Sequence, residues 1–234
     1  MSDKINFETY LFINSRKFII CVVHNISYDI IYSEQTLLTS NNKELNFEQL
    51  NEFLETNIFK VEKILKNFIK NINIILDSEE FFSVDLSIKK NNNGNFIDSN
   101  TLIHPLDDLK NSCQSNFQDK KIIHILIEKY LIDNKNYFSL PQKLKCNFFS
   151  LDVKFICLSK RFIEDLEIVL KKYHILVNQI LNASYVENFV NENHQNIFIT
   201  ASKIKSGLND NEVLLVRKTT KNKGFFEKFF SYFS

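Results

Sequence analysis

Glycine and proline are scarce in this sequence, which has three glycines and two prolines among 234 residues. A loop that cradles phosphate needs glycine, because glycine alone adopts positive φ angles freely and lets the backbone approach a ligand closely. The shortage argues against a glycine-rich nucleotide loop. No run of about eighteen apolar residues occurs either, so the sequence predicts no helix that spans a bilayer.

Charge of one sign and paired cysteines are also lacking. The formal net charge is +1, so no overall field favours nucleic acid. The four cysteines form no C-x-x-C pair, which is typical of reduced thiols in a cytosolic protein. The first residues, Met-Ser-Asp-Lys-Ile-Asn, lack the basic start and apolar stretch of a secretion signal. We therefore expect a cytoplasmic protein, with 44% apolar residues to build a core.

The apolar pattern alternates between strand and helix periods. Leu50, Leu54, Ile58, Val61 and Leu65 recur at helical spacing, and predict a helix over 46–68. Its start, Asn46 followed by Gln49, resembles a capping box. Further expected strands are two or three within 10–38, then 73–76, 81–88, 120–133, 146–158, 174–181 and 211–216. Further expected helices are 105–117, with Pro105 in the first turn, 161–173 and 183–192.

One stretch, from Lys121 to Asp133, carries a family resemblance. It reads Lys-Ile-Ile-His-Ile-Leu-Ile-Glu-Lys-Tyr-Leu-Ile-Asp, with His124, Tyr130 and Asp133 in the order of a known strand motif. This order resembles the FtsA family of bacterial cell-division proteins. The resemblance extends over about 10–185. Its other parts are the helix over 46–68, the loop with Pro141, the helix around Leu166 and the strand over 174–180.

The resemblance implies an α+β fold. It places a partial actin-like (ribonuclease-H-like) subdomain at 1–71 and 159–193, and an inserted strand-helix-strand-strand subdomain at 72–158. A flexible linker at 194–223 and an amphipathic helix at 224–234 would follow. About fifty residues follow Tyr185, so we expect the second half of an FtsA-type protein to be missing.

The expected phosphate loop departs from the family pattern. FtsA-type proteins carry aspartate-x-glycine-threonine between their first two strands, and the matching positions here are Phe12, Asn14 and Ser15. A phenylalanine ring cannot orient the water bound to Mg²⁺, and the side chain of Asn14 obstructs the approach of a phosphate. We expect no ATP binding, no cofactor and no enzymatic activity.

The C-terminal residues have the pattern of a membrane-surface helix. Five phenylalanines share one helical face, and basic residues lie beside or upstream of them. The expected membrane-binding residues are Phe225, Phe226, Phe229, Phe230, Phe233, Lys221, Lys223 and Lys228. FtsA-type proteins end in such a helix as well. Two alternatives remain, in which the aromatic face docks on a partner protein or on the protein's own core.

Other polar constellations predict no catalytic or metal site. His124 and Glu128 have the spacing of a helical metal pair, but on a strand they would lie about 13 Å apart. Glu79, Glu80 and Asp85 are expected to be solvated. No metal site is predicted.

The sequence therefore favours a non-catalytic, FtsA-like cell-division adaptor, peripheral to the cytoplasmic face of the bacterial inner membrane. Its expected partners are FtsZ, neighbouring copies, later divisome membrane proteins and an anionic membrane, with no nucleic acid. One alternative is a PilM-like adaptor of pilus assembly, which shares the insert. Another is an actin-fold ATPase completed by a partner chain.

Overall fold

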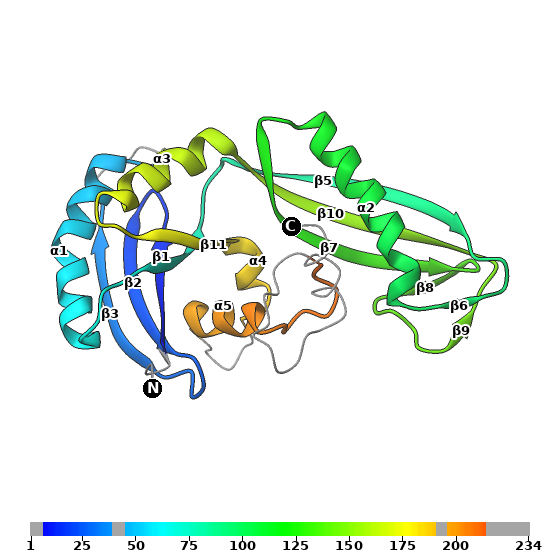
Figure 1. The fold of residues 1–234 in the computed structure, drawn as a ribbon, viewed down its shortest axis with the longest axis horizontal. Helices are drawn as coiled ribbons and strands as arrows, with labels where there is room; N and C mark the ends of the chain where they lie inside the picture. Colours follow the sequence, from blue (N-terminus) through cyan, green and yellow to red (C-terminus); the bar gives the residue numbers. More distant parts are fainter. Residues whose placement is uncertain (1–6, 39–44, 191–195, 214–234) are drawn as a thin grey trace. The chain divides into compact units, whose positions relative to one another are not determined.

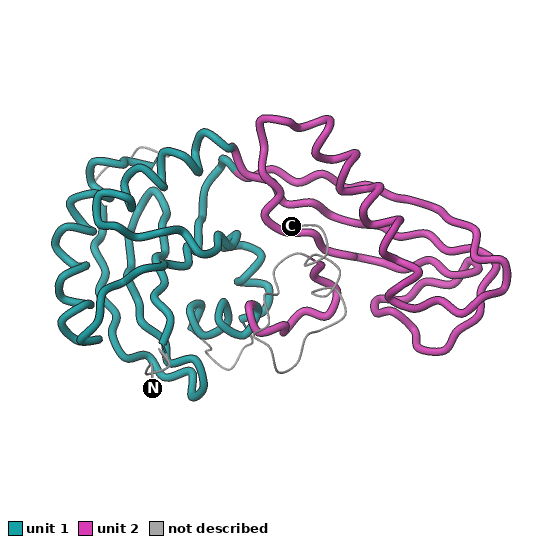
Figure 2. The backbone as a smooth tube through the Cα atoms, in the orientation of Figure 1, with its two compact units in different colours: residues 1–80, 160–204 teal, residues 81–159, 205–234 magenta. Residues whose placement is uncertain are grey.

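The computed structural model describes residues 7–38, 45–190 and 196–213, which form two compact units (Figures 1 and 2). The first unit comprises 1–80 and 160–204, and the second comprises 81–159 and 205–234. The second unit thus interrupts the first in the sequence. Each unit is described separately below.

The first unit is built on a five-stranded sheet with the order β11-β4-β1-β2-β3. Its strands are β1 (Phe7–Ile13), β2 (Lys17–His24), β3 (Ile30–Leu37), β4 (Asn71–Leu76) and β11 (Leu176–Asn182). The first three strands are antiparallel neighbours, while β4 runs parallel to β1 and β11 runs parallel to β4. This combination of order and direction is that of the ribonuclease-H-like sheet in actin-type subdomains, as the sequence predicted.

Helices pack on both faces of this sheet. They are α1 (Phe47–Leu65), α3 (Lys160–Lys171), α4 (Ala183–Glu187) and α5 (Ile197–Lys205). The ring centres of Phe18 on β2 and Phe53 on α1 are 5.8 Å apart. The ring centres of Tyr10 on β1 and Phe198 on α5 are 6.3 Å apart. Phe18 pairs with Ile13, and paired residues point to the same face of a sheet. Ile13 is three residues from Tyr10 on β1, so Phe18 and Tyr10 point to opposite faces. Both faces of the sheet are therefore covered.

The long helix α1 begins and ends with clear local signals. Asn46 is its N-cap, and its Oδ1 accepts hydrogen bonds from the backbone N–H groups of Glu48 and Gln49 at 3.0 and 3.1 Å. The helix ends at Lys66, which has φ 51° in the left-handed region. The predicted capping box is only half formed, because Oε1 of Gln49 is buried without a hydrogen-bond partner. The full capping box occurs instead at Asp98 and Thr101.

The second unit is a four-stranded sheet with the order β5-β10-β7-β8, and one helix packs on it. Its elements are β5 (Phe81–Asn91), β6 (Phe96–Ile97), α2 (Ser99–Asn116), β7 (Lys120–Ile132), β8 (Lys135–Tyr137), β9 (Leu144–Lys145) and β10 (Phe148–Ser159). Alternate residues of β10, from Phe149 to Phe155, are buried with Leu102, Leu106 and Leu109 of α2. The major elements β5, α2, β7 and β10 give the predicted strand-helix-strand-strand order.

Three predicted boundaries were wrong. The insert begins at Phe81 and not at 72, because β4 hydrogen bonds to β1 and β11 and its fully buried run Ile72–Leu76 is typical of a central parallel strand. Helix α2 begins at Ser99, so Pro105 lies inside it; the sequence analysis overlooked the N-cap Asp98. Residues 196–213 are not a linker, since Phe198, Ala201 and Val213 among them are buried.

Candidate functional site

The turn between β1 and β2 holds the residues predicted to form a degenerate phosphate loop. Oδ1 of Asn14 accepts hydrogen bonds from the backbone N–H groups of Arg16 and Lys17 at 2.9 and 2.8 Å. The backbone N–H of Asn14 donates to the carbonyl of Lys17 at 3.2 Å. Ser15 lies at the bend between them. Asn14 therefore closes the turn on itself, as asparagine often does.

Two further polar residues follow parallel strands of the same sheet. Asp77 follows β4, and its carboxylate accepts a hydrogen bond from Nδ2 of Asn14 at 3.3 Å. Asn182 ends β11, and its Oδ1 accepts from the backbone N–H of Tyr185 at 2.8 Å, which caps α4. In open α/β sheets, ligands bind beyond the carboxyl ends of the parallel strands. Here, the side-chain oxygens of both asparagines already bind the chain's own N–H groups.

Phe12, which the resemblance places at the aspartate position, is packed into the protein. It is 5% exposed, and the ammonium of Lys17 lies 5.3 Å from the centre of its ring. A phenyl ring in this place supplies no oxygen ligand for a metal ion. Within the described ranges, no group of three His, Cys, Asp or Glu residues could hold a metal ion.

In the second unit, His124 makes a contact that the sequence analysis missed. Its ring is fully buried, and Nδ1 lies 2.7 Å from Oε1 of Glu212, whose side chain is 1% exposed. The two residues are 88 positions apart. The backbone of the same segment pairs with β7, since Ile127 N–H donates to the Asn211 carbonyl and Val213 N–H donates to the Ile125 carbonyl, both at 3.0 Å. The sequence predicted a strand over 211–216, but it did not predict that this segment pairs with β7.

Tyr130 and Asp133, the other two residues of the family motif, also hold distant segments. The hydroxyl of Tyr130 donates to Oδ1 of Asn211 at 3.2 Å, and burial raises the pKa of Tyr130 to about 12. The carboxylate of Asp133 accepts from the N–H groups of Asn147 and Phe148 at 3.0 and 3.1 Å. The three motif residues therefore stabilise the insert, and none of them forms a catalytic group with the others.

The face of the insert sheet that points away from α2 is rich in charge. Lys154 on β10 pairs with Glu128 on β7, and Asp152 accepts a hydrogen bond from Ser87 on β5 at 2.6 Å. These side chains are part-exposed or exposed. Glu79, Glu80 and Asp85 are exposed, and they belong to no candidate metal site within the described part of the chain. This face is suited to polar contacts with another protein.

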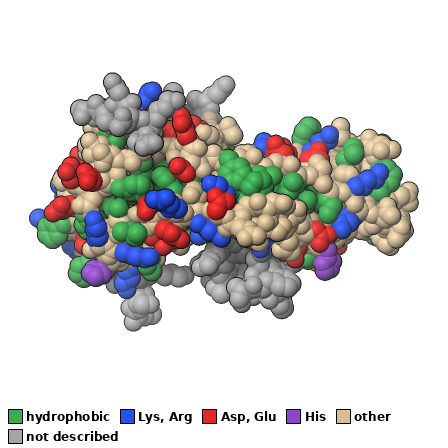
Figure 3. Space-filling model, turned by 90° about the horizontal axis from the view of Figure 1, so that it is seen from above, with side chains coloured by type: hydrophobic (Ala, Val, Ile, Leu, Met, Phe, Trp, Pro, Cys, Tyr) green, Lys and Arg blue, Asp and Glu red, His purple; other side chains and the backbone are tan. Residues whose placement is uncertain are grey.

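The predicted membrane-binding residues, from Lys221 to Phe233, lie outside the described residues. In the part of the chain that is described, no helix is long and apolar enough to cross a membrane. Over the face seen in Figure 3, Lys and Arg are interspersed with Asp and Glu. That face shows no broad field of one sign, such as a nucleic-acid surface requires.

Comparisons with known proteins find likeness only among solved structures. No protein-family model matches the sequence, and no curated protein matches it. The cytoplasmic domain of EpsL, an inner membrane component of the type II secretion system of Vibrio cholerae, is 12% identical over 77% of this chain and 58% of its own, with a TM-score of 0.39.

Two further solved structures share the likeness. A chain of the PilM-PilN type IV pilus biogenesis complex is 6% identical over 78% of this chain and 48% of its own, with a TM-score of 0.48. A Bacteroides thetaiotaomicron protein with an actin-like ATPase fold is 14% identical over 81% and 58%, with a TM-score of 0.32.

The present chain spans about half the length of the structures it matches. The strand order and directions described above define its fold class: an α+β, actin-like subdomain interrupted by a strand-helix-strand-strand insert.

Proposed function

We propose that this protein is a non-catalytic actin-fold adaptor that acts through contacts with other proteins at the cytoplasmic face of a bacterial inner membrane. The observation that carries the proposal is the turn closed by Asn14. Its Oδ1 occupies the N–H groups of Arg16 and Lys17, which are the kind of donors that a phosphate-binding turn presents to its ligand.

Binding a phosphate at this turn would require three changes. Two hydrogen bonds to Asn14 would break, the side chain would move away, and a cation would need ligands where Phe12 is buried. Because the turn is partly exposed, each lost hydrogen bond costs about 0.5–1.5 kcal/mol. Titration with a fluorescent ATP analogue and Mg²⁺ tests this part. Saturable binding at micromolar concentration would favour the alternative of an actin-fold ATPase completed by a partner chain.

An FtsA-like role in cell division is the first candidate within this class. It rests on the resemblance of the stretch that contains His124, Tyr130 and Asp133, which here shape the insert. In that family the insert contacts neighbouring copies and later division proteins. The charged face with Asp152 and Lys154 would serve such contacts.

The test is pull-down of divisome membrane proteins by the full chain, with Asp152→Lys as the variant and Glu79→Lys as a control of equal charge change. We expect the first substitution alone to reduce capture. A parallel titration with the FtsZ tail peptide decides whether FtsZ is a direct partner. Equal capture by both variants would contradict the role of this face.

A PilM-like role in pilus assembly is the second candidate. The matched solved structures include a PilM-PilN complex of pilus biogenesis and an inner membrane component of a secretion system. In this case the partner would be a PilN-like protein of pilus assembly. Capture of such a protein, together with no capture of division proteins, would select this candidate.

Membrane attachment is proposed to reside in residues 224–234. Burial of a phenylalanine side chain contributes at most about 1.5–3 kcal/mol, so loss of two should release the protein from vesicles. The variant is Phe226→Ser with Phe230→Ser, and the matched control is Ser231→Ala on the other helical face. Flotation with phosphatidylglycerol vesicles is expected to fail for the double variant only. If the double variant still floats, the anchor lies elsewhere.

A further inference from the structure

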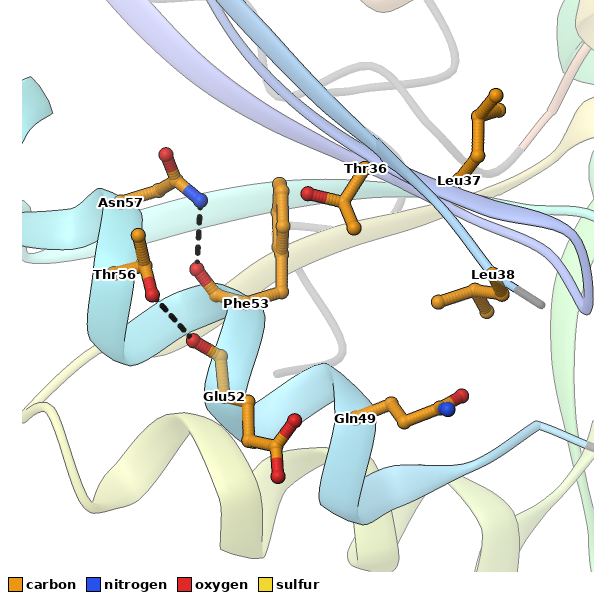
Figure 4. Close-up of a pocket in the computed structure, with 8 residues that line it drawn as sticks. All are labelled: Thr36, Leu37, Leu38, Gln49, Glu52, Phe53, Thr56 and Asn57. Carbon is orange, nitrogen blue, oxygen red and sulfur yellow. Dashed lines mark hydrogen bonds between the residues drawn. The ribbon is translucent and has the colours of Figure 1, made fainter. Parts of the chain in front are cut away.

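The first unit has an open sheet edge beside a groove. Strand β3 is the last strand of its sheet, and its residues are almost all exposed. On the side of β3 that faces α1, the structure has a hollow of about 240 Å³. Figure 4 shows Phe53 rising from α1 toward the strand that carries Thr36, with Gln49 and Leu38 at one end. A strand edge and a helix thus form the two walls of the groove.

The backbone of β3 offers donors and acceptors along this edge. Leu38 N–H donates to the Arg16 carbonyl at 2.7 Å, so this pair is of the hydrogen-bonded type. Such pairs alternate with non-bonded pairs in an antiparallel ladder, and the register continues unbroken to Cys21 opposite Ser33. The N–H and carbonyl groups of Ser33, Gln35 and Leu37 therefore point away from β2. In the described part of the chain they have no backbone partner.

The side chains along the edge differ between its two faces. On the face away from α1, Leu37 is apolar and 70% exposed, and Ile31, at a β-bulge nearer the start of the strand, is 42% exposed. On the face toward α1, Glu34 lies along the strand from Thr36, and Glu52 lines the groove. Neither carboxylate has an ion-pair partner among the residues that the structure describes. The buried Oε1 of Gln49 adds an acceptor without a donor, while Lys60 beside Asn57 is the cation at the far end.

Another open edge, β5, lacks these features. It carries Asp85, Lys89 and Lys90, and lysines on an edge strand oppose the addition of another strand, above all a basic one. Half of its side chains are packed against the insert core. Among the described residues, the β3 edge combines free backbone groups, exposed apolar side chains and an adjoining groove.

From these observations we infer that the β3 edge and the α1 groove bind an extended segment of a partner protein, which adds to the sheet as a sixth strand. The segment alternates apolar side chains, which cover Leu37, with basic side chains, which approach Glu34 and Glu52. Main-chain hydrogen bonds supply the affinity of such complexes and alternate side chains supply the specificity. The inference is independent of the proposed contacts of the insert, so either can fail alone.

A second copy of this chain fits the edge less well. Symmetric antiparallel pairing about Gln35 would place each Glu34 opposite Thr36 of the other copy and diagonal to the other Glu34. Like charges at neighbouring cross-strand positions are destabilising. The groove carboxylates therefore favour a basic partner over self-association.

The test uses the full ¹⁵N-labelled chain and an eight-residue capped peptide of alternating valine and lysine as the probe. Gln35→Pro removes an outward N–H and leaves the bonds to β2 intact, since proline is accepted on edge strands at such positions. Gln35→Ala keeps the N–H and is the matched control. We expect saturable NMR shifts at Ser33, Gln35 and Leu37, affinity at least about tenfold lower for Gln35→Pro, and nearly unchanged affinity for Gln35→Ala.

Charge substitutions provide a second part of the test. Glu34→Gln and Glu52→Gln should each weaken the lysine probe a few-fold and reduce its salt dependence, and a probe with glutamate in place of lysine should bind more weakly. Equal binding by Gln35→Pro, or equal binding of the glutamate probe, would overturn the inference. A dimer abolished by Gln35→Pro would make a second copy the occupant. Binding only after removal of 214–234 would make the chain's own tail the occupant, which also overturns it.

Discussion

Polar side chains form local hydrogen bonds at the strand ends of the first unit and long-range ones on strand β7 of the second unit. At the strand ends of the first unit, Asn14 and Asn182 bind backbone N–H groups two or three residues away. In the second unit, His124 and Tyr130 bind residues 88 and 81 positions away. Local bonds fix single turns, whereas long-range bonds hold a segment onto a sheet. At these strand ends, the side-chain oxygens of Asn14 and Asn182 bind the chain's own backbone, which supports the proposal that function resides on exposed surfaces.

Breaking the His124–Glu212 pair should have the largest effect, because His124→Ala leaves a carboxylate buried without this partner. We expect the free energy of unfolding to fall by about 3 kcal/mol, measured by urea denaturation. The matched control is Glu128→Gln on the same strand, which removes a part-exposed pair and should cost less than about 1 kcal/mol. Similar losses in both variants would contradict the contrast between buried and exposed contacts.

Asp133→Ala should have the next largest effect. It leaves the N–H groups of Asn147 and Phe148 without their acceptor, and we expect a loss of about 2 kcal/mol. Asp133→Asn should cost about half as much, since its oxygen still accepts and asparagine tolerates the φ of 42° at this position. Faster amide hydrogen exchange at Asn147 and Phe148 would accompany the loss. Unchanged exchange would show that other contacts hold the loop.

Asn14→Ala should cost about 1 kcal/mol, because its effect is confined to one turn. The control, Asn14→Ser, keeps a side-chain acceptor for the turn without placing a second carboxylate beside Asp77, and should retain most of the stability. Thermal unfolding of both variants gives the measurement. A loss at Asn14 as large as that at His124 would break the proposed difference between the units.

Alkaline pH should affect both units, with no effect at neutral pH. Burial raises the pKa of Cys21 in the first unit and of Cys157 in the second from 9.0 to about 12. Because the folded state holds these protons more tightly, the stabilisation is complete below about pH 9 and is lost as pH rises toward about 12. Cys157→Ala should show a shallower fall of unfolding free energy over that range. A slope equal to that of the natural chain would rule out this thiol as a contributor.

Much of the fold could be predicted from the sequence because it rests on local periodicity. The α1 helix follows from apolar residues at helical spacing and the N-cap Asn46, and β7 and β10 follow from β-branched and aromatic runs. The sheet to which β4 belongs could not be predicted, because a short buried strand carries no sign of which sheet it joins. Its parallel pairing with β1 and β11 is a long-range choice.

The site was predicted less completely. By resemblance, the sequence predicted that Phe12 and Asn14 stand where FtsA-type proteins have aspartate and glycine, and this stays a prediction. The sequence alone could not show that Oδ1 of Asn14 accepts hydrogen bonds from the N–H groups of Arg16 and Lys17. Glu212 lay in a segment treated as a linker, and its acidic side chain resembles any solvated residue until His124 is placed beside it. The β3 groove was missed for a similar reason, since it arises from the packing of α1 beside an edge strand.

Calorimetric titration of the full chain with Mg²⁺ and ATP tests the central claim most directly. The closed turn at Asn14 and the buried ring of Phe12 predict no saturable heat at millimolar nucleotide for the natural chain. Saturable binding that is weakened by Asp77→Ala would place a nucleotide at the ends of β1 and β4, and would contradict the account.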